Sequence, residues 1–248
     1  MFSQKIFNNN VCYISGLHRS GKSLLTAILP SLEKSGLINK DPTLNLISQL
    51  YMNKEASLNL SRYLIRFIIS NTNYSNFIGR KINLKKTDET SIFHHINYNY
   101  YLKKLTSKRK IKKPDKIFEK KINFFDIHNI LYNLKLWHNI DKNFKLINID
   151  RNPIDLAYSW HSNKFGTFKK SSINQLLLYQ IDKKLVPAYA KSWSNKYVKM
   201  SEIDRIIEII YDQTITSNKN IKFFKMKRHK ILLLKYEEIL NKPYENLS

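Results

Sequence analysis

The sequence has few of the residues that cross-link or interrupt a chain: one cysteine, five glycines and six prolines in 248 residues. A single cysteine, Cys12, excludes an internal disulfide, so a reducing cytoplasm is the simplest compartment. No apolar run comes near the ~18 residues of a membrane-spanning helix, and residues 1–11 lack the apolar core of a secretory signal. Few linkers are possible with so little glycine and proline. We therefore predict a single cytoplasmic domain over residues 1–248.

Arginine is also scarce, although the chain is strongly basic. The formal net charge is +24, but the 43 basic residues comprise 35 lysines and only 8 arginines, next to 27 asparagines. An AT-rich genome imposes this pattern on the proteins it encodes, whereas arginine is the usual residue for bidentate contacts to bases and phosphates. The composition therefore favours a basic surface that handles anionic ligands over a dedicated nucleic-acid-binding protein.

Hydrophobic periodicity predicts strands that alternate with helices along the chain. Asp41 followed by Pro42 is typical of a helix start. The lysine-rich run 103–116 is typical of a solvated loop. We expect strands over 11–15, 144–150 and 230–236, and helices over 21–35, 41–71 (two helices), 124–140, 172–199 and 201–216, with one more opened by Pro153. This alternation predicts an α/β fold: a mostly parallel sheet covered by helices on both faces, with ligands at the carboxyl ends of the strands.

The stretch GLHRSGKSLL, residues 16 to 25, lies between a predicted strand and a predicted helix. Its two glycines and the following Lys22 and Ser23 form the G-x-x-x-x-G-K-S frame of a phosphate-binding loop. In such a loop, glycine allows close backbone approach, and successive N–H groups entering the helix attract an anion. We therefore expect a phosphate-bearing nucleotide to contact Gly16, Leu17, His18, Arg19, Ser20, Gly21, Lys22, Ser23 and Leu24.

A second stretch, RNPIDLAYS at 151 to 159, follows the predicted strand 144–150. Arg151 stands at the exit of that strand, and Ser159 lies eight residues later, about two turns into a helix. The guanidinium and the hydroxyl could converge on one dianionic group. The spacing alone supports equally well an ion pair between Arg151 and Asp155, or a cap by Arg151 on the end of the sheet, with no role for Ser159 in either case.

Taken together, the two stretches resemble motifs of the sulfotransferase family. GLHRSGKSLL is similar to the family's 5′-phosphosulfate loop, RNPIDLAYS to its 3′-phosphate motif, and ILLLKYEEILNKP, 231 to 243, to a late strand and the segment after it. The resemblance implies a P-loop NTPase-like α/β fold with large helical insertions. It also implies the donor 3′-phosphoadenosine 5′-phosphosulfate (PAPS), whose product is 3′-phosphoadenosine 5′-phosphate (PAP).

The resemblance also implies roles for single residues. Arg19 would occupy the position of a catalytic cation, Arg151 and Ser159 would bind the 3′-phosphate, and no metal would take part. The chain ends five residues after Pro243, before the family's segment that closes over the adenine, so we expect a short or truncated member.

The acceptor side of the reaction is less defined by the resemblance. Transfer to a hydroxyl or amine needs a general base, and family bases are often a carboxylate or a histidine in the first half of the chain. The stretch KTDETSIFHH, 86 to 95, supplies both. We choose Glu89 and His94 as candidates, with Asp88, His95 and His161 as alternatives. The loop resembles bacterial and Golgi-type carbohydrate enzymes, so we expect a carbohydrate or glycolipid acceptor.

Lys22 keeps a second function open, because the family usually has threonine at this position. In a sulfotransferase, Lys22 and Arg19 would stabilise charge on the leaving phosphate. Lysine also restores the loop of a kinase or NTPase, in which Lys22 would contact the β- and γ-phosphates of ATP, Ser23 would bind Mg²⁺ and Asp150 would be the second carboxylate.

Overall fold

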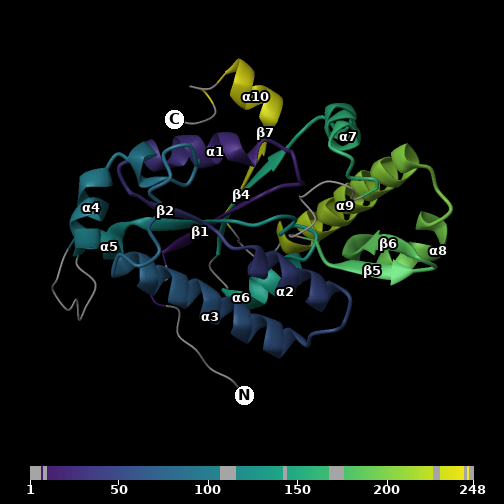
Figure 1. Ribbon diagram of the computed structural model, residues 1–248, viewed down its shortest axis with the longest axis horizontal. Helices are drawn as coiled ribbons and strands as arrows, with labels where there is room; N and C mark the ends of the chain where they lie inside the picture. Colours follow the sequence, from purple (N-terminus) through teal and green to yellow (C-terminus); the bar gives the residue numbers. More distant parts are fainter. Residues whose placement is uncertain are drawn as a thin grey trace.

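The computed structural model describes residues 7, 10–106, 116–141, 144–167, 176–225, 230–242 and 245. Its centre is a five-stranded sheet in the order β2-β3-β1-β4-β7 (Figure 1), with every neighbouring pair parallel. The strands are β1 (Val11–Ser15), β2 (Ser35–Lys40), β3 (Ile122–Asp126), β4 (Lys145–Asp150) and β7 (Lys230–Lys235). Because β1 is the central strand, the loop that follows it emerges at the middle of the carboxyl edge of the sheet.

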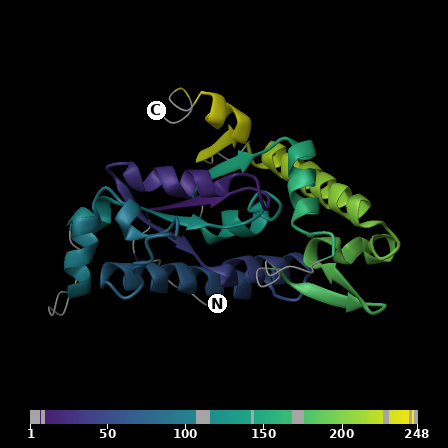
Figure 2. The same cartoon turned by 45° about the horizontal axis from the view of Figure 1, so that its top comes forward.

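Helices cover both faces of the sheet and its carboxyl edge (Figures 1 and 2). One face carries α1 and α10, the other carries α2, α3 and α6, and α9 lies beyond the carboxyl ends with the hairpin β5–β6. The helices are α1 (Lys22–Ile28), α2 (Pro42–Met52), α3 (Leu58–Phe77), α4 (Tyr98–Thr106), α5 (Lys116–Lys120), α6 (Leu134–Ile140), α7 (Pro153–Ser162), α8 (Ser194–Tyr197), α9 (Glu202–Lys225) and α10 (Tyr236–Asn241), and the hairpin strands are β5 (Leu178–Ile181) and β6 (Lys184–Pro187). Short 3₁₀ helices span Leu29–Ser31, Ile92–His94 and Ala188–Trp193.

The apolar run of β1 is continuous because the strand is buried on both faces. Successive side chains of a strand point to opposite sides. Tyr13 packs with Trp137 in the core under α2, α3 and α6, whereas Ile14 packs with Leu25 in the core under α1. A central parallel strand with two buried faces needs this uninterrupted apolar composition.

The fold class expected from the sequence is confirmed, and so are several elements. The expected strands at 11–15, 144–150 and 230–236 correspond to β1, β4 and β7, and the region 41–71 forms α2 and most of α3. Asp41 caps α2, since its side chain accepts a hydrogen bond from the backbone N–H of Thr43, and Pro153 opens α7. Among the described residues, no helix is both long and apolar enough to cross a membrane.

The helix expected over 124–140 is wrong. Residues 122–126 form β3, which pairs with β1 and β2, and only Leu134–Ile140 is helical. Phe124 and Phe125 pack into the cores on opposite faces of the sheet. A short apolar run fits a buried strand as well as a helix segment, and pairing with two distant strands decides between them here.

Three other helix predictions need correction. The helix expected over 21–35 ends at Ile28, two residues before Pro30, and Ser35 already begins β2. Leu32, which falls within the expected helix, lies beyond α1 and is 46% exposed. The region expected to be helical over 172–199 contains the hairpin β5–β6, whose turn residues Asp182 and Lys183 both have positive φ, and residues 172–175 lie outside the described part. The last helix, α9, runs beyond 216 to Lys225.

The lysine-rich run 103–116 is described only at its two ends. Residues 103–106 are the last of α4, and Lys116 is the first of α5. The remaining residues, 107–115, lie outside the described residues, as does Pro243 of the late segment.

Candidate functional site

The loop between β1 and α1 has a shape that only glycine permits at two positions. Gly16 has φ +151°, and a Cβ there would lie 2.4 Å from the carbonyl oxygen of Ile149 in the neighbouring strand. Gly21, the N-cap of α1, has φ +100°, and a Cβ would lie 2.2 Å from the ring of Tyr236. The loop therefore passes close to β4 on one side and to the start of α10 on the other, as a tight phosphate-binding turn does.

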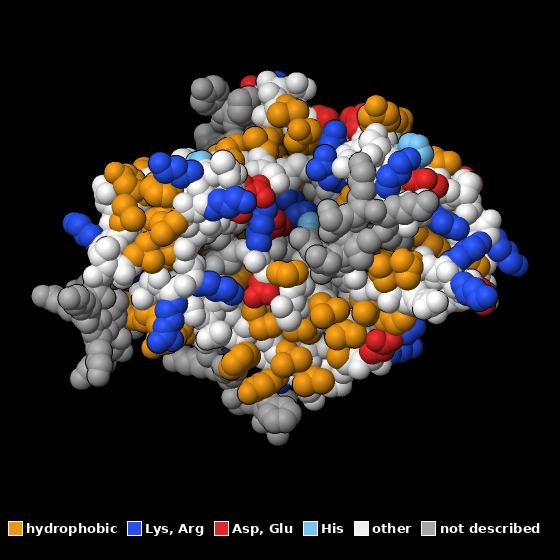
Figure 3. Space-filling view, viewed as in Figure 1, with side chains coloured by type: hydrophobic (Ala, Val, Ile, Leu, Met, Phe, Trp, Pro, Cys, Tyr) orange, Lys and Arg blue, Asp and Glu red, His pale blue; other side chains and the backbone are white. Residues whose placement is uncertain are grey.

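A cavity of about 530 Å³ lies in front of this loop, at the carboxyl ends of β2, β3 and β4. It opens on the face seen in Figure 3, where basic, acidic and histidine side chains meet in a hollow. The predicted loop residues that line it are His18, Arg19, Gly21, Lys22 and Ser23, and other lining residues include Lys40, Asp41, Pro42, Asn45, Asp126, His128, Arg151, Asn163, Phe165 and Tyr236. Four cationic side chains in one lining suit an anionic ligand.

The other predicted loop residues point elsewhere. Gly16, Leu17 and Ser20 line a smaller cavity of about 160 Å³ between the loop and α9, and Leu24 packs into the core under α1. Ser20 Oγ is buried and has no hydrogen-bond partner among the described residues. The loop joins a strand to a helix as expected, but the residues predicted to bind one ligand divide between two cavities.

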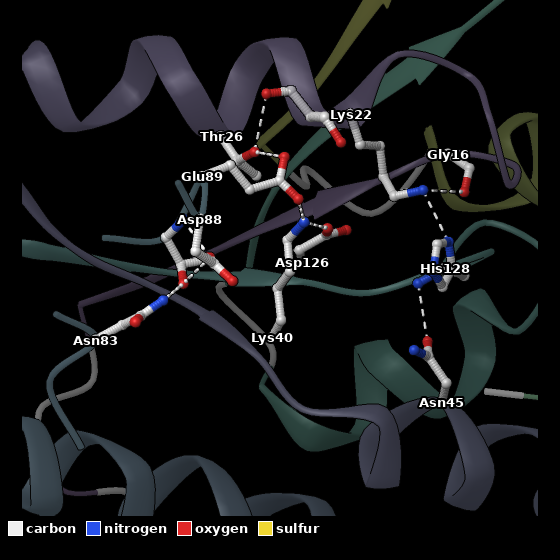
Figure 4. Close-up of polar contacts among 12 residues, drawn as sticks. Gly16, Lys22, Thr26, Lys40, Asn45, Asn83, Asp88, Glu89, Asp126 and His128 are labelled. Atoms are coloured by element: carbon white, nitrogen blue, oxygen red, sulfur yellow. Dashed lines mark hydrogen bonds and ion pairs between the residues drawn. The ribbon is translucent and has the colours of Figure 1, made fainter. Parts of the chain in front are cut away.

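Lys22 is buried, and the loop wraps around its ammonium group (Figure 4). Lys22 Nζ lies 3.4 Å from the carbonyl oxygen of Gly16, 3.2 Å from that of Leu17 and 2.7 Å from His128 Nδ1. Burial lowers the pKa of Lys22 to about 8, an effect that Asp126 opposes. Lys22 therefore loses its proton at a lower pH than an exposed lysine does.

The ring of His128, which follows β3, is stacked on the ring of His18 in the loop, with the ring centroids 3.7 Å apart. The backbone N–H of His128 donates a hydrogen bond to Asn45 Oδ1 at 2.8 Å. His18 is buried, and burial, with His128 and Lys22 close by, keeps its pKa well below the usual value. His18 is therefore neutral near pH 7, which allows the two rings to stack beside Lys22.

The second motif meets the loop. Arg19 Nε donates to Ser159 Oγ at 3.2 Å, and an Arg151 Nη1 N–H donates to the carbonyl oxygen of Arg19 at 3.0 Å. The Arg151 guanidinium also lies over the ring of Tyr236, 5.0 Å from its centre, and its buried Nε has no partner among the described residues. Within the described chain Arg151 forms no ion pair with Asp155, so the ion pair of the alternative interpretation is not formed.

Glu89 lies beside the loop, but strong partners hold it. Its carboxylate is paired with Lys40 and accepts a hydrogen bond from Thr26 Oγ1 at 2.9 Å (Figure 4). Partial burial raises the pKa of Glu89, but the bonds from Lys40, Ser23 and Thr26 outweigh it and leave the pKa below its usual value. A carboxylate stabilised in its charged form is a weak proton acceptor.

The other base candidates lie apart from the cavity lining. His94 is exposed and its ring contacts the carbonyl oxygen of Lys86, and Asp88 accepts hydrogen bonds from Thr90. His95 is buried against Gly36 with its pKa lowered to about 4 by burial. His161 is directed at Glu202 on α9, 3.8 Å away.

Sequence reasoning missed Lys40, Asp126 and His128 because it missed the strands that position them. Lys40 is the last residue of β2, Asp126 is the last of β3, and His128 follows two residues later. The available signal was two short apolar runs, 37–38 and 124–125, each followed by polar residues. Polar residues at the carboxyl ends of parallel strands are where ligands bind in such sheets.

Asp150, the second carboxylate of the kinase interpretation, does not face this cavity. It lines the smaller cavity, where Asn148 Nδ2 donates to its Oδ1 at 2.9 Å, and burial raises its pKa. Two other carboxylates, those of Asp41 and Asp126, line the larger cavity together with Lys22 and Ser23. Of these, Asp126 ends β3, the strand that pairs with β1.

The chain matches no protein-family model and no curated protein sequence. Among solved structures it is similar to a sulfotransferase domain from the curacin biosynthetic pathway, with 12% sequence identity and a TM-score of 0.47. The match covers 98% of this chain and 72% of that one. The fold class given above is based on the sheet and helices themselves.

Proposed function

We propose that this protein binds PAPS and transfers its sulfuryl group to a hydroxyl or amine of an acceptor, a carbohydrate or glycolipid. The observation that carries the proposal is the contact between Arg19 Nε and Ser159 Oγ, which joins the loop motif to the motif at the exit of β4. Two anion-binding motifs side by side match a donor with a phosphosulfate at one end and a 3′-phosphate at the other. A nucleoside triphosphate has no 3′-phosphate that the second motif could bind.

The residues present fit this donor. The loop amides and Lys22 would hold the 5′-phosphosulfate, while Arg151 and Ser159 would hold the 3′-phosphate. Arg151 Nε, buried without a partner among the described residues, is an unused donor for such a group. Tyr236 lines the cavity beside Gly21, and its ring, over which the Arg151 guanidinium lies, would border the bound nucleotide.

Bound PAPS supplies the sulfuryl group and a phosphate leaving group. Transfer forms a bond from sulfur to the acceptor oxygen or nitrogen and breaks the bond from sulfur to the phosphate oxygen. Negative charge grows on that oxygen, so Lys22, Arg19 and the loop amides would stabilise it where it develops. The acceptor loses its proton to a base on the protein.

His128 is the base we propose, in place of Glu89 and His94. It lines the cavity, and its Nδ1 lies 2.7 Å from Lys22 Nζ. An anion on the loop draws Lys22 toward itself, and Nδ1 can then accept a proton from the acceptor. Glu89 is held in its charged form by Lys40, and His94 does not line the cavity. Donor binding and base activation would thus be coupled through one lysine.

The cavity lining supports a polyhydroxylated acceptor. Lys40, Asp41, Asn45 and Asn163 provide donors and acceptors of hydrogen bonds, and Phe165 provides a ring face. A sugar has both hydroxyl groups and an apolar face, whereas a phenol needs a largely apolar pocket.

Thermal unfolding with three ligands tests the proposal: PAP in EDTA, ATP with Mg²⁺, and a nucleic-acid duplex. We expect PAP to raise the midpoint without metal. Arg151→Ala should reduce that shift, whereas Arg80→Ala, a change at an exposed arginine, should preserve it. Stabilisation only by ATP with Mg²⁺ would instead support a kinase or NTPase, the second candidate, which is favoured by Asp126 beside Lys22 and Ser23.

A further inference from the structure

Lys40 places its ammonium group between two carboxylates at the mouth of the loop (Figure 4). Its Nζ pairs with Glu89 and lies 3.4 Å from Asp126 Oδ2. These three residues come from β2, β3 and the segment before residue 92, so the cluster is formed only by the tertiary structure. Lys40 thus supplies the cavity with a cation from the protein itself, which sequence analysis did not identify.

Both carboxylates lie near α1. Glu89 accepts a hydrogen bond from Thr26 Oγ1 at 2.9 Å, and the nearby Ser23 hydroxyl helps to lower the Glu89 pKa. The Asp126 side chain is only 7% exposed, lines the same cavity as Ser23, and has an Oδ1 with no partner among the described residues. Two carboxylates near a loop hydroxyl are the oxygen ligands that Mg²⁺ prefers.

We propose that Lys40 takes the place of a divalent metal ion at this loop. Its ammonium neutralises part of the charge of Glu89 and Asp126, so an anionic ligand can bind the loop without a metal. Removing it leaves two uncompensated carboxylates beside the anion, which would repel the anion and attract a metal. Lys40 would therefore let the chain keep Lys22 and Ser23 without requiring a nucleotide–Mg²⁺ complex.

Direct metal binding is the first test, with Mn²⁺ alone as the probe and electron paramagnetic resonance as the readout. The unaltered protein should show no Mn²⁺ site in the cavity. Lys40→Met keeps the length of the side chain but removes the charge, and it should create one Mn²⁺ site. The double variant Lys40→Met with Asp126→Asn should lose that site, which would locate the metal.

Lys191→Met is a matched control. Lys191 pairs with Glu55, and the two side chains are 35% and 36% exposed, close to the 35% and 32% of Lys40 and Glu89. Neither Lys191 nor Glu55 lines the cavity in front of the loop. Removing this ammonium should create no Mn²⁺ site, because no second carboxylate and no loop hydroxyl are described beside it.

Metal rescue of ligand binding is the second test. In EDTA, Lys40→Met should bind PAP about tenfold more weakly than the unaltered protein, a difference of about 1.4 kcal/mol. Mg²⁺ should restore the affinity of the variant and leave that of the unaltered protein unchanged. Lys40→Arg keeps the charge and should need no metal. A loss of affinity through structural damage alone would not respond to Mg²⁺.

Three results would overturn the proposal: an Mn²⁺ site in the cavity of the unaltered protein, tighter PAP binding by that protein in Mg²⁺, or a folded Lys40→Met variant that gains no Mn²⁺ site. The first two results come from the unaltered protein, so they test the proposal even if Lys40→Met does not fold.

The Mn²⁺ measurements contain neither PAPS nor PAP, so they do not depend on the proposed function. If PAP does not bind but they come out as expected, the proposed sulfuryl transfer fails and the role of Lys40 stands.

Discussion

Arg19 Nε donates a hydrogen bond to Ser159 Oγ at 3.2 Å, across 140 residues of sequence. The carbonyl oxygen of the same Arg19 accepts a hydrogen bond from Arg151. The loop after β1 and the exit of β4 therefore form one continuous polar surface. Substitutions on the two sides of this contact should therefore affect the binding of different parts of the proposed donor.

Ser159→Ala should weaken PAP binding about tenfold, because it removes one hydrogen bond to a charged phosphate. Binding of adenosine 5′-phosphate, which lacks the 3′-phosphate, should change less than twofold. Calorimetric titration with the two nucleotides measures the difference. Equal losses for both would place Ser159 outside the 3′-phosphate site.

Arg19→Ala should lower turnover by about 100-fold, while PAP affinity falls only a few fold. The guanidinium is exposed at the loop and would act mainly on charge that develops during transfer. Arg19→Lys keeps the charge and should recover part of the rate. Steady-state rates with PAPS, compared with PAP dissociation constants, separate the two effects, and equal losses would make Arg19 a binding residue only.

His128→Asn should lower kcat by about 100-fold and leave PAP affinity within about threefold. The amide can still contact Lys22, which lies 2.7 Å from His128 Nδ1, but it cannot accept a proton. The variant thus separates proton transfer from positioning of the lysine. A variant with full kcat would return the role of base to another group.

Affinity for PAP should fall as pH rises above about 8, the pKa to which burial lowers Lys22. The free protein loses the Lys22 proton in this range, whereas the bound anion favours the charged lysine, so binding must take up a proton. The loss should approach tenfold per pH unit. Lys22→Arg stays charged and should bind PAP with little pH dependence between pH 7 and 9; a similar slope in both proteins would assign it to another group.

Gly16→Ala should lower the free energy of unfolding by about 2 kcal/mol or more. The added Cβ would lie 2.4 Å from the carbonyl oxygen of Ile149, a backbone atom that cannot rotate away. Asn71→Ala, at an exposed position of α3, should change it by less than about 0.5 kcal/mol. Urea denaturation measures both, and a small cost at Gly16 would mean that β1 and β4 can separate at this point.

Local sequence sufficed for the two motifs and the elements that carry them. The apolar runs of β1 and β4 are each followed by a helix start, at Lys22 and Pro153, so the loop and Arg151 could both be placed at strand exits. Their contact could not be read from the chain, because no spacing reports which side chains of two crossover units approach each other. Only the parallel pairing of β1 with β4 brings Arg19 to Ser159.

Local sequence was thus enough to predict the fold class, the glycine-framed loop after β1 and the positions of Arg151 and Ser159 after β4, because those features depend on neighbours along the chain. Tertiary structure alone decided that Lys40, Asp126 and His128 share a cavity with Lys22. Lys40 ends β2, Asp126 ends β3 and His128 comes two residues after β3. Both β2 and β3 are short strands that exist as strands because distant partners supply their backbone hydrogen bonds. An apolar run as short as 37–38 or 124–125 has no local property that fixes this pairing, and so the places of His128 and Lys40 in the cavity were visible only in the folded protein.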